Sequence, residues 1–186
     1  MPLATAAPRE ATRTAPAPSD TAAPTVTFVD YRGEEDIPLL MGLVDKDLSE
    51  PYSIFTYRYF LHNWPNLCVF AYIGDDPVGV VVCKIDEEPD GSGATTRGYI
   101  GMLAVDTSRR RHGIGSKLLL TAIGRMRDVG CASVGLEMEV SNVGAARLYE
   151  RLGFVREELM VRYYLNWGDA YRLRLWFDNE ETAAAS

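Results

Sequence analysis

Residues 107–119 contain the densest positive cluster of the chain, and two glycines lie within it. The segment reads TSRRRHGIGSKLL, with Gly113 and Gly115 at the start of an apolar helical pattern. The first N–H groups of a helix have no partner inside the helix, and the helix dipole is positive at that end. Glycines leave those amides uncovered by side chains. The spacing therefore predicts a turn that binds a phosphate-type anion.

Two common phosphate-binding motifs do not fit this turn. The spacing GxxxxGK[ST] is absent, and a dinucleotide fingerprint would need a third glycine where Leu118 stands. The formal net charge of −7 disfavours a general nucleic-acid or membrane-surface binder. A nucleic-acid contact through residues 109–111 alone is kept as a weaker alternative, as is a simple solvated basic face.

Two carboxylates occupy alternate positions of a predicted strand that follows the turn. Glu137 and Glu139 stand in LEMEV, and residues i and i+2 of a strand point to the same face. Two acidic side chains on one face beside an anion site favour general base chemistry over a purely structural role. We predict Glu137 as the base, with Glu139 as the next candidate. His112 titrates near neutrality, but its place in the anion turn argues against that role.

The elements that must position these residues follow from hydrophobic periodicity. Strands are predicted over residues 26–31, 67–74, 77–85, 97–106, 133–140, 154–165 and 169–177. Helices are predicted over residues 33–48, 57–64, 113–130 and 142–152, and a loop over residues 87–96. The order β-α-α-β-β-β-α-β-α-β-β indicates an α/β (α+β) domain with a central β-α-β-α unit. It does not indicate a doubly wound nucleotide-binding fold.

The chain has 186 residues, of which 47% are hydrophobic, which suits one folded domain. We predict a disordered Ala/Pro-rich extension over residues 1–24, the domain over residues 25–178 and a short flexible tail over residues 179–186. A transit peptide is a weaker alternative for the extension, because its two arginines are balanced by two acidic residues.

The three cysteines are predicted to be reduced core thiols. Cys68, Cys83 and Cys131 show neither zinc-ligand spacing nor a disulfide framework. We therefore expect no metal site. No apolar stretch approaches the ~20 residues that a membrane-spanning helix needs.

Two further segments carry a family resemblance. Residues 110–115 match R-x-x-G-x-G/A, and residues 142–154 match N-x-x-A-x-x-x-Y-x-x-x-G-F. With an MLAV-type strand before the turn and an LE strand after it, they resemble the GNAT superfamily of acetyl-CoA-dependent N-acetyltransferases. The resemblance implies a GNAT fold, a mixed and mostly antiparallel sheet of about seven strands flanked by about four helices. It also implies that the glycine turn holds the coenzyme A pyrophosphate. The residues expected at acetyl-CoA are Met102, Leu103, Ala104, Val105, Arg110, Arg111, His112, Gly113, Ile114, Gly115, Ser116, Asn142 and Tyr149.

Longer segments narrow the resemblance to the family of NatC catalytic subunits. They read DLSEPYSIFTYRYFLHNWP, RGYIGMLAVD, LEMEVSNVGAARLYERLGF and RYYLNWGDAYRL, and together they span about residues 45–175. The resemblance implies acetyl transfer to the α-amino group of nascent proteins that begin with Met followed by a bulky apolar residue. It also implies a large auxiliary subunit, a small Sm-like subunit and the ribosome as partners, and a cytoplasmic location.

The predicted chemistry is direct attack of the amine on a thioester. An α-amino group has a pKa of about 7.7 to 8.0, so a modest base such as Glu137, acting through water, suffices to expose its lone pair. By resemblance, Tyr149 lies near the coenzyme sulfur and protonates the leaving thiolate, while residues 102–105 pair with the pantetheine arm. The substrate end is expected to consist of Leu48, Glu50, Pro51, Tyr52, Glu139, Tyr163 and Tyr164.

Two other functions stay open from the sequence. One is a GNAT acetyltransferase for a small molecule or a lysine side chain. The other is a non-catalytic module that binds acetyl-CoA without turnover.

Overall fold

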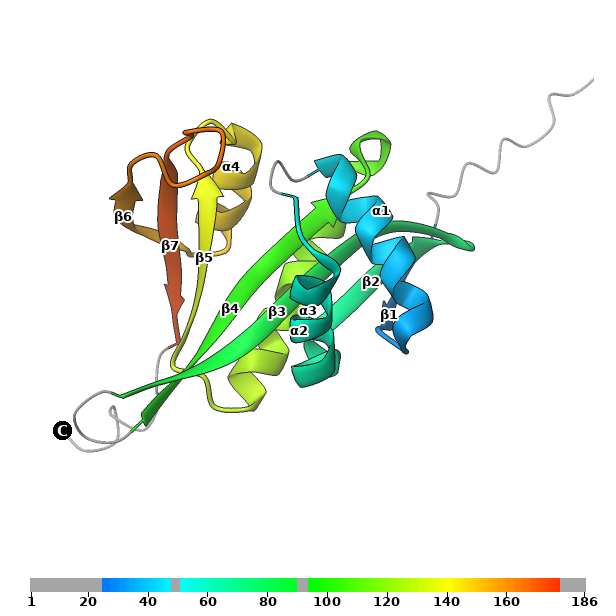
Figure 1. Cartoon of the computed structure of the whole chain (residues 1–186), viewed down its shortest axis with the longest axis horizontal. Helices are drawn as coiled ribbons and strands as arrows, with labels where there is room; N and C mark the ends of the chain where they lie inside the picture. The colour runs from blue at the N-terminus through cyan, green and yellow to red at the C-terminus, as the bar shows by residue number, and fades with distance from the viewer. Residues whose placement is uncertain (1–24, 48–50, 90–93, 178–186) are drawn as a thin grey trace, which may run out of the picture.

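The computed structural model describes residues 25–47, 51–89 and 94–177. They form a seven-stranded sheet in the order β1-β2-β3-β4-β5-β7-β6 (Figure 1). Neighbouring strands are antiparallel except β4 and β5, which are parallel. The predicted mixed, mostly antiparallel sheet is therefore confirmed. The strands are β1 (Val26–Asp30), β2 (Cys68–Ile73), β3 (Asp76–Pro89), β4 (Ala94–Val105), β5 (Ser133–Glu139), β6 (Val155–Met160) and β7 (Ala170–Trp176).

The described part of the chain contains four α-helices, and the element order is the predicted one. They are α1 (Ile37–Asp47), α2 (Ile54–Asn63), α3 (Ile114–Asp128) and α4 (Val143–Arg151). Three 3-10 turns, η1 (Glu34–Asp36), η2 (Pro65–Leu67) and η3 (Thr107–Arg109), precede α1, β2 and α3 respectively. Asn142 caps α4 by accepting a 3.0 Å hydrogen bond from the backbone N–H of Ala145, as its position in the sequence predicts.

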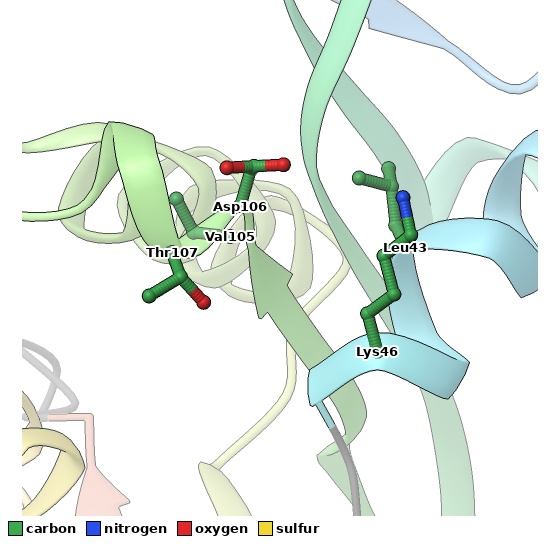
Figure 2. A pocket seen from close by; sticks show the side chains of 5 residues that line it. All are labelled: Leu43, Lys46, Val105, Asp106 and Thr107. Carbon is green, nitrogen blue, oxygen red and sulfur yellow. The ribbon is translucent and has the colours of Figure 1, made fainter.

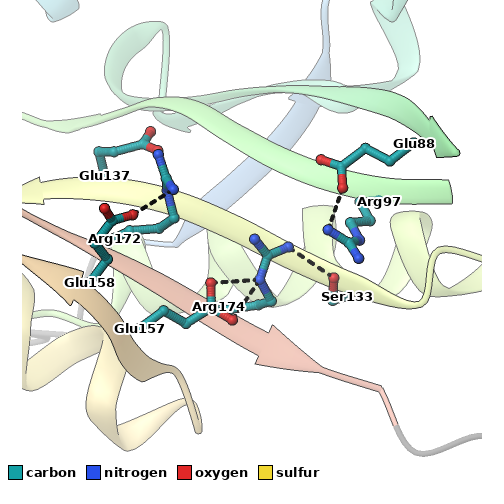
Figure 3. Close-up of polar contacts among 8 residues, drawn as sticks. All are labelled: Glu88, Arg97, Ser133, Glu137, Glu157, Glu158, Arg172 and Arg174. Carbon is teal, nitrogen blue, oxygen red and sulfur yellow. Dashed lines mark hydrogen bonds and ion pairs between the residues drawn. The ribbon is translucent and has the colours of Figure 1, made fainter. Parts of the chain in front are cut away.

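Two apolar clusters cover the two faces of the sheet. Helices α1 and α2 pack on one face, where Phe70, Val80 and Val82 are buried. Helix α3 packs on the other face against the alternate residues of the same strands, and α4 extends that cluster over β5 and β7. The alternation of buried side chains along β2 and β3 thus follows the two-residue period of a strand. On β5, β6 and β7 the face turned away from α4 carries charged side chains, as Figure 3 shows.

Strands β4 and β5 pair only over a short stretch and then separate. Their ladder runs from Arg97 opposite Ser133 to Tyr99 opposite Gly135. Beyond it β4 continues to Val105 and β5 to Glu139, and β5 bonds to β7 along its other edge. Figure 1 shows the two strands diverging upwards. The edges that face each other past Tyr99 therefore bound an opening in the middle of the sheet.

A bulge at Gly101 lies where this opening begins. The β3–β4 register passes from Cys83 opposite Ile100 to Val82 opposite Met102, so Gly101 is the extra residue. A Cβ on Gly101 would lie 2.7 Å from the ring of Phe60 on α2. Only glycine fits beneath that ring without a shift. The bulge turns both Gly101 and Met102 toward the α1/α2 face, which alternation alone does not predict.

Some predicted boundaries were wrong. The loop predicted over residues 87–96 is shorter, because β3 extends to Pro89 and β4 begins at Ala94. Helix α2 begins at Ile54 rather than at residue 57, since Ser53 accepts a hydrogen bond from Thr56 N–H and caps it. The strand predicted over residues 154–165 ends at Met160. The predicted extension over residues 1–24 and the tail over residues 179–186 lie outside the described residues.

The cysteines are free and buried, as predicted. Burial raises the pKa of the Cys68 and Cys83 thiols above the ordinary range. Among the described residues, no helix is both long and apolar enough to cross a membrane.

Candidate active site

A cavity of about 770 Å³ occupies the opening between β4 and β5. Ligand sites typically measure about 300 to 1,000 Å³, so this volume suits a molecule of coenzyme size. Its wall on β4 and β5 consists of Ile100, Gly101, Met102, Leu103, Val105, Leu136, Glu137, Met138 and Glu139. The remaining lining residues come from the turn before α3, from the first turn of α3, from α4 and its cap, and from two aromatic loops.

The glycine turn forms one end of this cavity. Gly113 has a φ of 77° and caps α3, and Arg111 also has a positive φ of 67°. Nothing lies within 4 Å of the place that a Cβ on Gly113 would take. Gly113, Ile114, Gly115 and Ser116 all line the cavity, so the free N–H groups at the start of α3 are accessible to an anion there.

Arginines line the cavity from two elements. Arg110 and Arg111 line the cavity from the turn itself, and Arg110 Nε donates a 3.0 Å hydrogen bond to the Val105 carbonyl. Arg147 and Arg151 line it from α4. They are four residues apart and therefore share one helix face. Arg147 and Arg151 were not among the predicted site residues, although their i, i+4 spacing next to the Asn142 cap could have revealed them.

Tyr149 lies on the cavity wall formed by α4. It is 7% exposed and packs edge-on against Phe154 at 5.5 Å between ring centroids. It belongs to the apolar cluster on the α3 side of the sheet. This packing thus restricts the Tyr149 ring beside the cavity.

Glu137 reaches the cavity from the opposite face of the sheet. Its Oε2 accepts a 2.7 Å hydrogen bond from the Tyr99 hydroxyl, and its Oε1 accepts one of 3.3 Å from Arg172 Nε. Burial, and then the Glu137 charge, raise the pKa of the Tyr99 phenol above its usual range. Tyr99 therefore remains a donor at neutral pH. Neither Tyr99 nor Arg172 was among the predicted site residues.

The predicted substrate residues are brought together in part. Tyr52 and Tyr164 line the cavity together with Glu139. Tyr163 stands beside Tyr164 with ring centroids 5.1 Å apart and is 46% exposed. Burial, and then the Tyr163 phenol, raise the pKa of Tyr164. Pro51 is exposed and does not line the cavity, and Leu48 and Glu50 lie outside the described residues.

Two of the predicted coenzyme residues lie away from the cavity lining. Ala104 is buried in the cluster beneath α1 and α2. His112 is exposed, and its Nδ1 lies 2.8 Å from the Arg110 carbonyl oxygen. The other eleven predicted coenzyme residues all line the cavity, Asn142 and Tyr149 included. Within the ranges that the structure describes, no group of three or more Asp, Glu, His or Cys side chains could hold a metal ion.

A second, much smaller cavity of about 90 Å³ lies between the ends of α1 and β4. Figure 2 shows Leu43 and Lys46 on α1 facing Val105, Asp106 and Thr107. Hydrogen bonds from Ser108 hold the pKa of the Asp106 carboxyl below its usual range. The volume is far too small for a coenzyme, so the large cavity is the candidate active site.

Comparisons with a family model and with known proteins point to the same family. The model of the acetyltransferase (GNAT) family matches residues 37–154. The human protein N-alpha-acetyltransferase 30 is 52% identical over 152 residues, which are 82% of this chain and 41% of that protein. N-alpha-acetyltransferase MAK3 of Arabidopsis thaliana is 50% identical over 152 residues, 82% of this chain and 78% of that protein. The chain thus spans about two fifths of the human relative and most of the plant relative.

A solved structure supports the same relationship. A chain in the crystal structure of the NatC complex bound to Gag peptide and CoA superposes with a TM-score of 0.78 and 43% identity. The match covers 82% of this chain and 99% of that chain. The similarity therefore extends over nearly all of the described residues.

Proposed function

Because the chain belongs to the acetyltransferase (GNAT) family, we propose that it is an N-terminal protein acetyltransferase of the NatC type. It transfers an acetyl group from acetyl-CoA to the α-amino group of proteins that begin with Met followed by a bulky apolar residue. The high identity to two proteins named as N-alpha-acetyltransferases supports the activity. The likeness to a chain of the NatC complex supports the assignment to that type.

One structural observation carries the proposal. The cavity between β4 and β5 is lined from both faces of the sheet: by the glycine turn and Tyr149 on the α3 side, and by Glu137 on the other. A coenzyme on one side and a peptide on the other can meet only where the sheet is open. Such an arrangement brings an amine and a thioester together in one place.

Acetyl-CoA fits the residues on the α3 side. The bare amides at Gly113 and Gly115, together with Arg110, Arg111, Arg147 and Arg151, would hold its phosphates. Among the described residues the β4–β5 ladder ends at Tyr99, and beyond it Met102 and Leu103 line the cavity, so the backbone of residues 102–105 would bind the amides of the pantetheine arm. Acetyl-CoA supplies the acetyl thioester.

Glu137 and Tyr149 carry the proton transfers in this proposal. Glu137 takes a proton from the α-ammonium group through a water molecule, which leaves the amine able to attack the carbonyl carbon. As the C–N bond forms and the C–S bond breaks, Tyr149 gives its hydroxyl proton to the departing sulfur, and the proton still in excess on the nitrogen passes to water, from which the tyrosine hydroxyl is restored. The two residues approach from opposite faces of the sheet. Tyr149 therefore does not transfer its proton directly to Glu137.

The peptide end is proposed to lie between the loop that contains Tyr52 and the loop that contains Tyr163 and Tyr164. Tyr52 and Tyr164 line the cavity near Glu139. Aromatic walls favour an apolar second residue, while Glu139 and Glu50 would attract the positive α-ammonium group. Leu48 and Pro51 complete the predicted set.

The charge of these loops does not favour an acidic second residue. Arg162 lies in the second loop, but its guanidinium lies over the Trp167 ring, 5.8 Å from the centroid, and it does not line the cavity. An acidic side chain in the cavity would instead lie near the carboxylates of Glu137 and Glu139. Repulsion between like charges would weaken its binding.

We further propose the partners that the NatC likeness implies. The chain would act in the cytoplasm, at the ribosome, with a large auxiliary subunit and a small Sm-like subunit. The similar solved chain is part of a NatC complex, which supports auxiliary subunits for this chain too.

A peptide panel tests the function. Met-Leu, Met-Ala, Met-Glu and Ser-Ala peptides are compared by kcat/KM with acetyl-CoA as donor, using the full chain with its co-purifying subunits. Each buried methylene stabilises binding by ~0.8 kcal/mol, so Met-Leu should exceed Met-Ala by about 10- to 200-fold. Met-Glu and Ser-Ala should react far more slowly. Replacing Tyr164 by Ala should reduce the preference for Met-Leu as well as the rate.

The panel also separates the other functions. A preference for Met-Glu or Ser-Ala would contradict the NatC-type assignment but leave an N-terminal acetyltransferase. Binding of acetyl-CoA in calorimetry without turnover on any peptide or free amine would indicate a non-catalytic module.

A further inference from the structure

The Glu137 carboxylate is held from two sides by two different strands. Tyr99 on β4 donates to Oε2, and Arg172 on β7 donates from Nε to Oε1. Arg172 in turn donates from Nη1 to Glu158 Oε2 on β6 at 2.8 Å. Figure 3 shows the Arg172 guanidinium between the carboxylates of Glu137 and Glu158. Only 13% of the Glu137 side chain is exposed.

The backbone register places these side chains. Glu137 lies opposite Arg172 in the β5–β7 ladder, and Arg172 lies opposite Glu158 in the β7–β6 ladder. Directly paired residues on one face of a sheet have their Cβ atoms about 4.5–5.5 Å apart. The contact is therefore built into the strand pairing and does not depend on a loop.

Charged side chains on this face of the sheet also continue on the other side of Glu137, toward β4 and β3. Lys84 on β3 lies opposite Tyr99 on β4, and its Nζ lies 5.2 Å from the centroid of the Tyr99 ring. Asp86 pairs with the Lys84 ammonium at 2.8 Å. The cations Lys84 and Arg172 thus lie on either side of Glu137. Glu158, on the edge strand β6, lies beyond Arg172.

We propose that Arg172 is a positioning residue for the acetyl transfer: it fixes the Glu137 carboxylate so that the base faces the bound amine, and Glu158 fixes Arg172. The proposal rests on the proposed function, in which Glu137 is the base. Without Arg172, the Tyr99 hydroxyl is the one remaining side-chain partner of the carboxylate within the described part of the chain, and the carboxylate can then rotate about its terminal torsion. Displacement of a catalytic group by about 1 Å can slow a reaction by about 100-fold.

Arg174 provides a matched control on the same strand. It lies two residues after Arg172 and on the same face, and its Nε donates to both oxygens of Glu157 at 2.8 Å. It also donates to Ser133 Oγ at 3.3 Å. Arg174 therefore resembles Arg172 in its ion pair with β6, but its partner on β5 is Ser133 rather than Glu137. A purely structural role for Arg172 predicts equal effects at the two positions.

The test uses steady-state kinetics with acetyl-CoA and a Met-Leu peptide on the full chain with its subunits. Arg172→Gln should lower kcat by about 10- to 100-fold, with the KM for acetyl-CoA within about twofold and a melting temperature equal to that of Arg174→Gln. Arg172→Lys, which keeps a cation but loses the planar fork, should recover part of the rate. Glu158→Gln should cause a smaller loss of about two- to fivefold. Arg174→Gln should retain the parent kcat.

A double variant shows whether Arg172 acts through Glu137. In the Glu137→Gln background, Arg172→Gln should cause no further loss of kcat, because no carboxylate remains to be positioned. A further loss equal to that of the single variant would overturn the proposal, as would equal kinetics for Arg172→Gln and Arg174→Gln. Both results leave the proposed function intact if Glu137→Gln alone is slow. Full activity of Glu137→Gln would instead refute the base assignment and this positioning role together.

Discussion

The Tyr99 hydroxyl donates a 2.7 Å hydrogen bond to Glu137 across the opening between β4 and β5. Tyr99 is the last β4 residue paired with β5, opposite Gly135, and Glu137 is the next β5 residue on the same face. Tyr99 therefore lies at the end of the β4–β5 pairing, and its hydroxyl orients the carboxylate of Glu137, which lies just beyond that end. The position at which the β4–β5 ladder ends thus places a hydrogen-bond donor beside the proposed base.

Removal of the Tyr99 hydroxyl should impair the chemistry more than coenzyme binding. Tyr99→Phe keeps the ring but removes the donor to Glu137 Oε2. We expect kcat to fall by about 10- to 100-fold, while the dissociation constant for acetyl-CoA, measured by calorimetry, changes less than about twofold. Tyr72→Phe on β2 is the matched control, because Tyr72 is partly buried like Tyr99 but is not the tyrosine that donates to Glu137. Equal rates for the two variants would rule out a role for the Tyr99 hydroxyl.

The proposed base and acid should each control turnover. Glu137→Gln and Tyr149→Phe are expected to lower kcat by about 10- to 10⁴-fold with little change in coenzyme affinity. The measurement is kcat between pH 6 and pH 9 with a Met-Leu peptide. Undiminished turnover of Glu137→Gln over this range would move the base elsewhere, with Glu139 as the first candidate because it also lines the cavity.

Coenzyme binding should depend on the absence of a side chain at Gly115. Gly115 lines the cavity, and a Cβ there would already lie 3.6 Å from Leu148 and from Val105. Gly115→Leu should therefore fill the anion site and weaken acetyl-CoA binding by at least about 10-fold. Gly124→Leu on the same helix is the control, since nothing lies within 4 Å of its Cβ position. Unchanged coenzyme affinity in a folded Gly115→Leu protein would contradict the anion-turn assignment.

The stability of the fold should fall in acid partly through Asp36. This carboxylate is 1% exposed, and it accepts hydrogen bonds from the Arg32 N–H at 2.9 Å and from Arg32 Nη2 at 2.8 Å. The side-chain hydrogen bond from Arg32 holds the pKa of Asp36 below its usual 3.8. A carboxyl whose pKa is lowered by folding stabilises the protein above its unfolded-state pKa, and this contribution is lost as the pH falls through the folded-state pKa.

Chemical denaturation checks this sign. Asp36→Asn should lower the free energy of unfolding at pH 7 by about 1 to 3 kcal/mol. The difference from the parent should shrink as the pH is lowered below about 4. A difference that stays constant from pH 7 to pH 3 would show that the charge of Asp36 does not contribute.

Sequence alone determined the features that depend on local chain geometry. The turn proposed to bind an anion follows from glycines at a helix start, the shared face of Glu137 and Glu139 from the two-residue period of a strand, and the start of α4 from the Asn142 cap. Each of these signals lies within about ten residues of chain. The cap at Ser53 was equally local and could have placed the start of α2 correctly.

The tertiary structure decided which distant residues complete the site. Tyr99 and Arg172 reach Glu137 from positions 38 and 35 residues away along the chain. Their contacts depend on strand register in the β5–β7 ladder and on where the β4–β5 ladder ends. A shift of one residue in pairing would turn each side chain to the other face. Hydrophobic periodicity specifies that a segment is a strand, but only packing between segments selects its partners and register, and with them the residues that surround the proposed base.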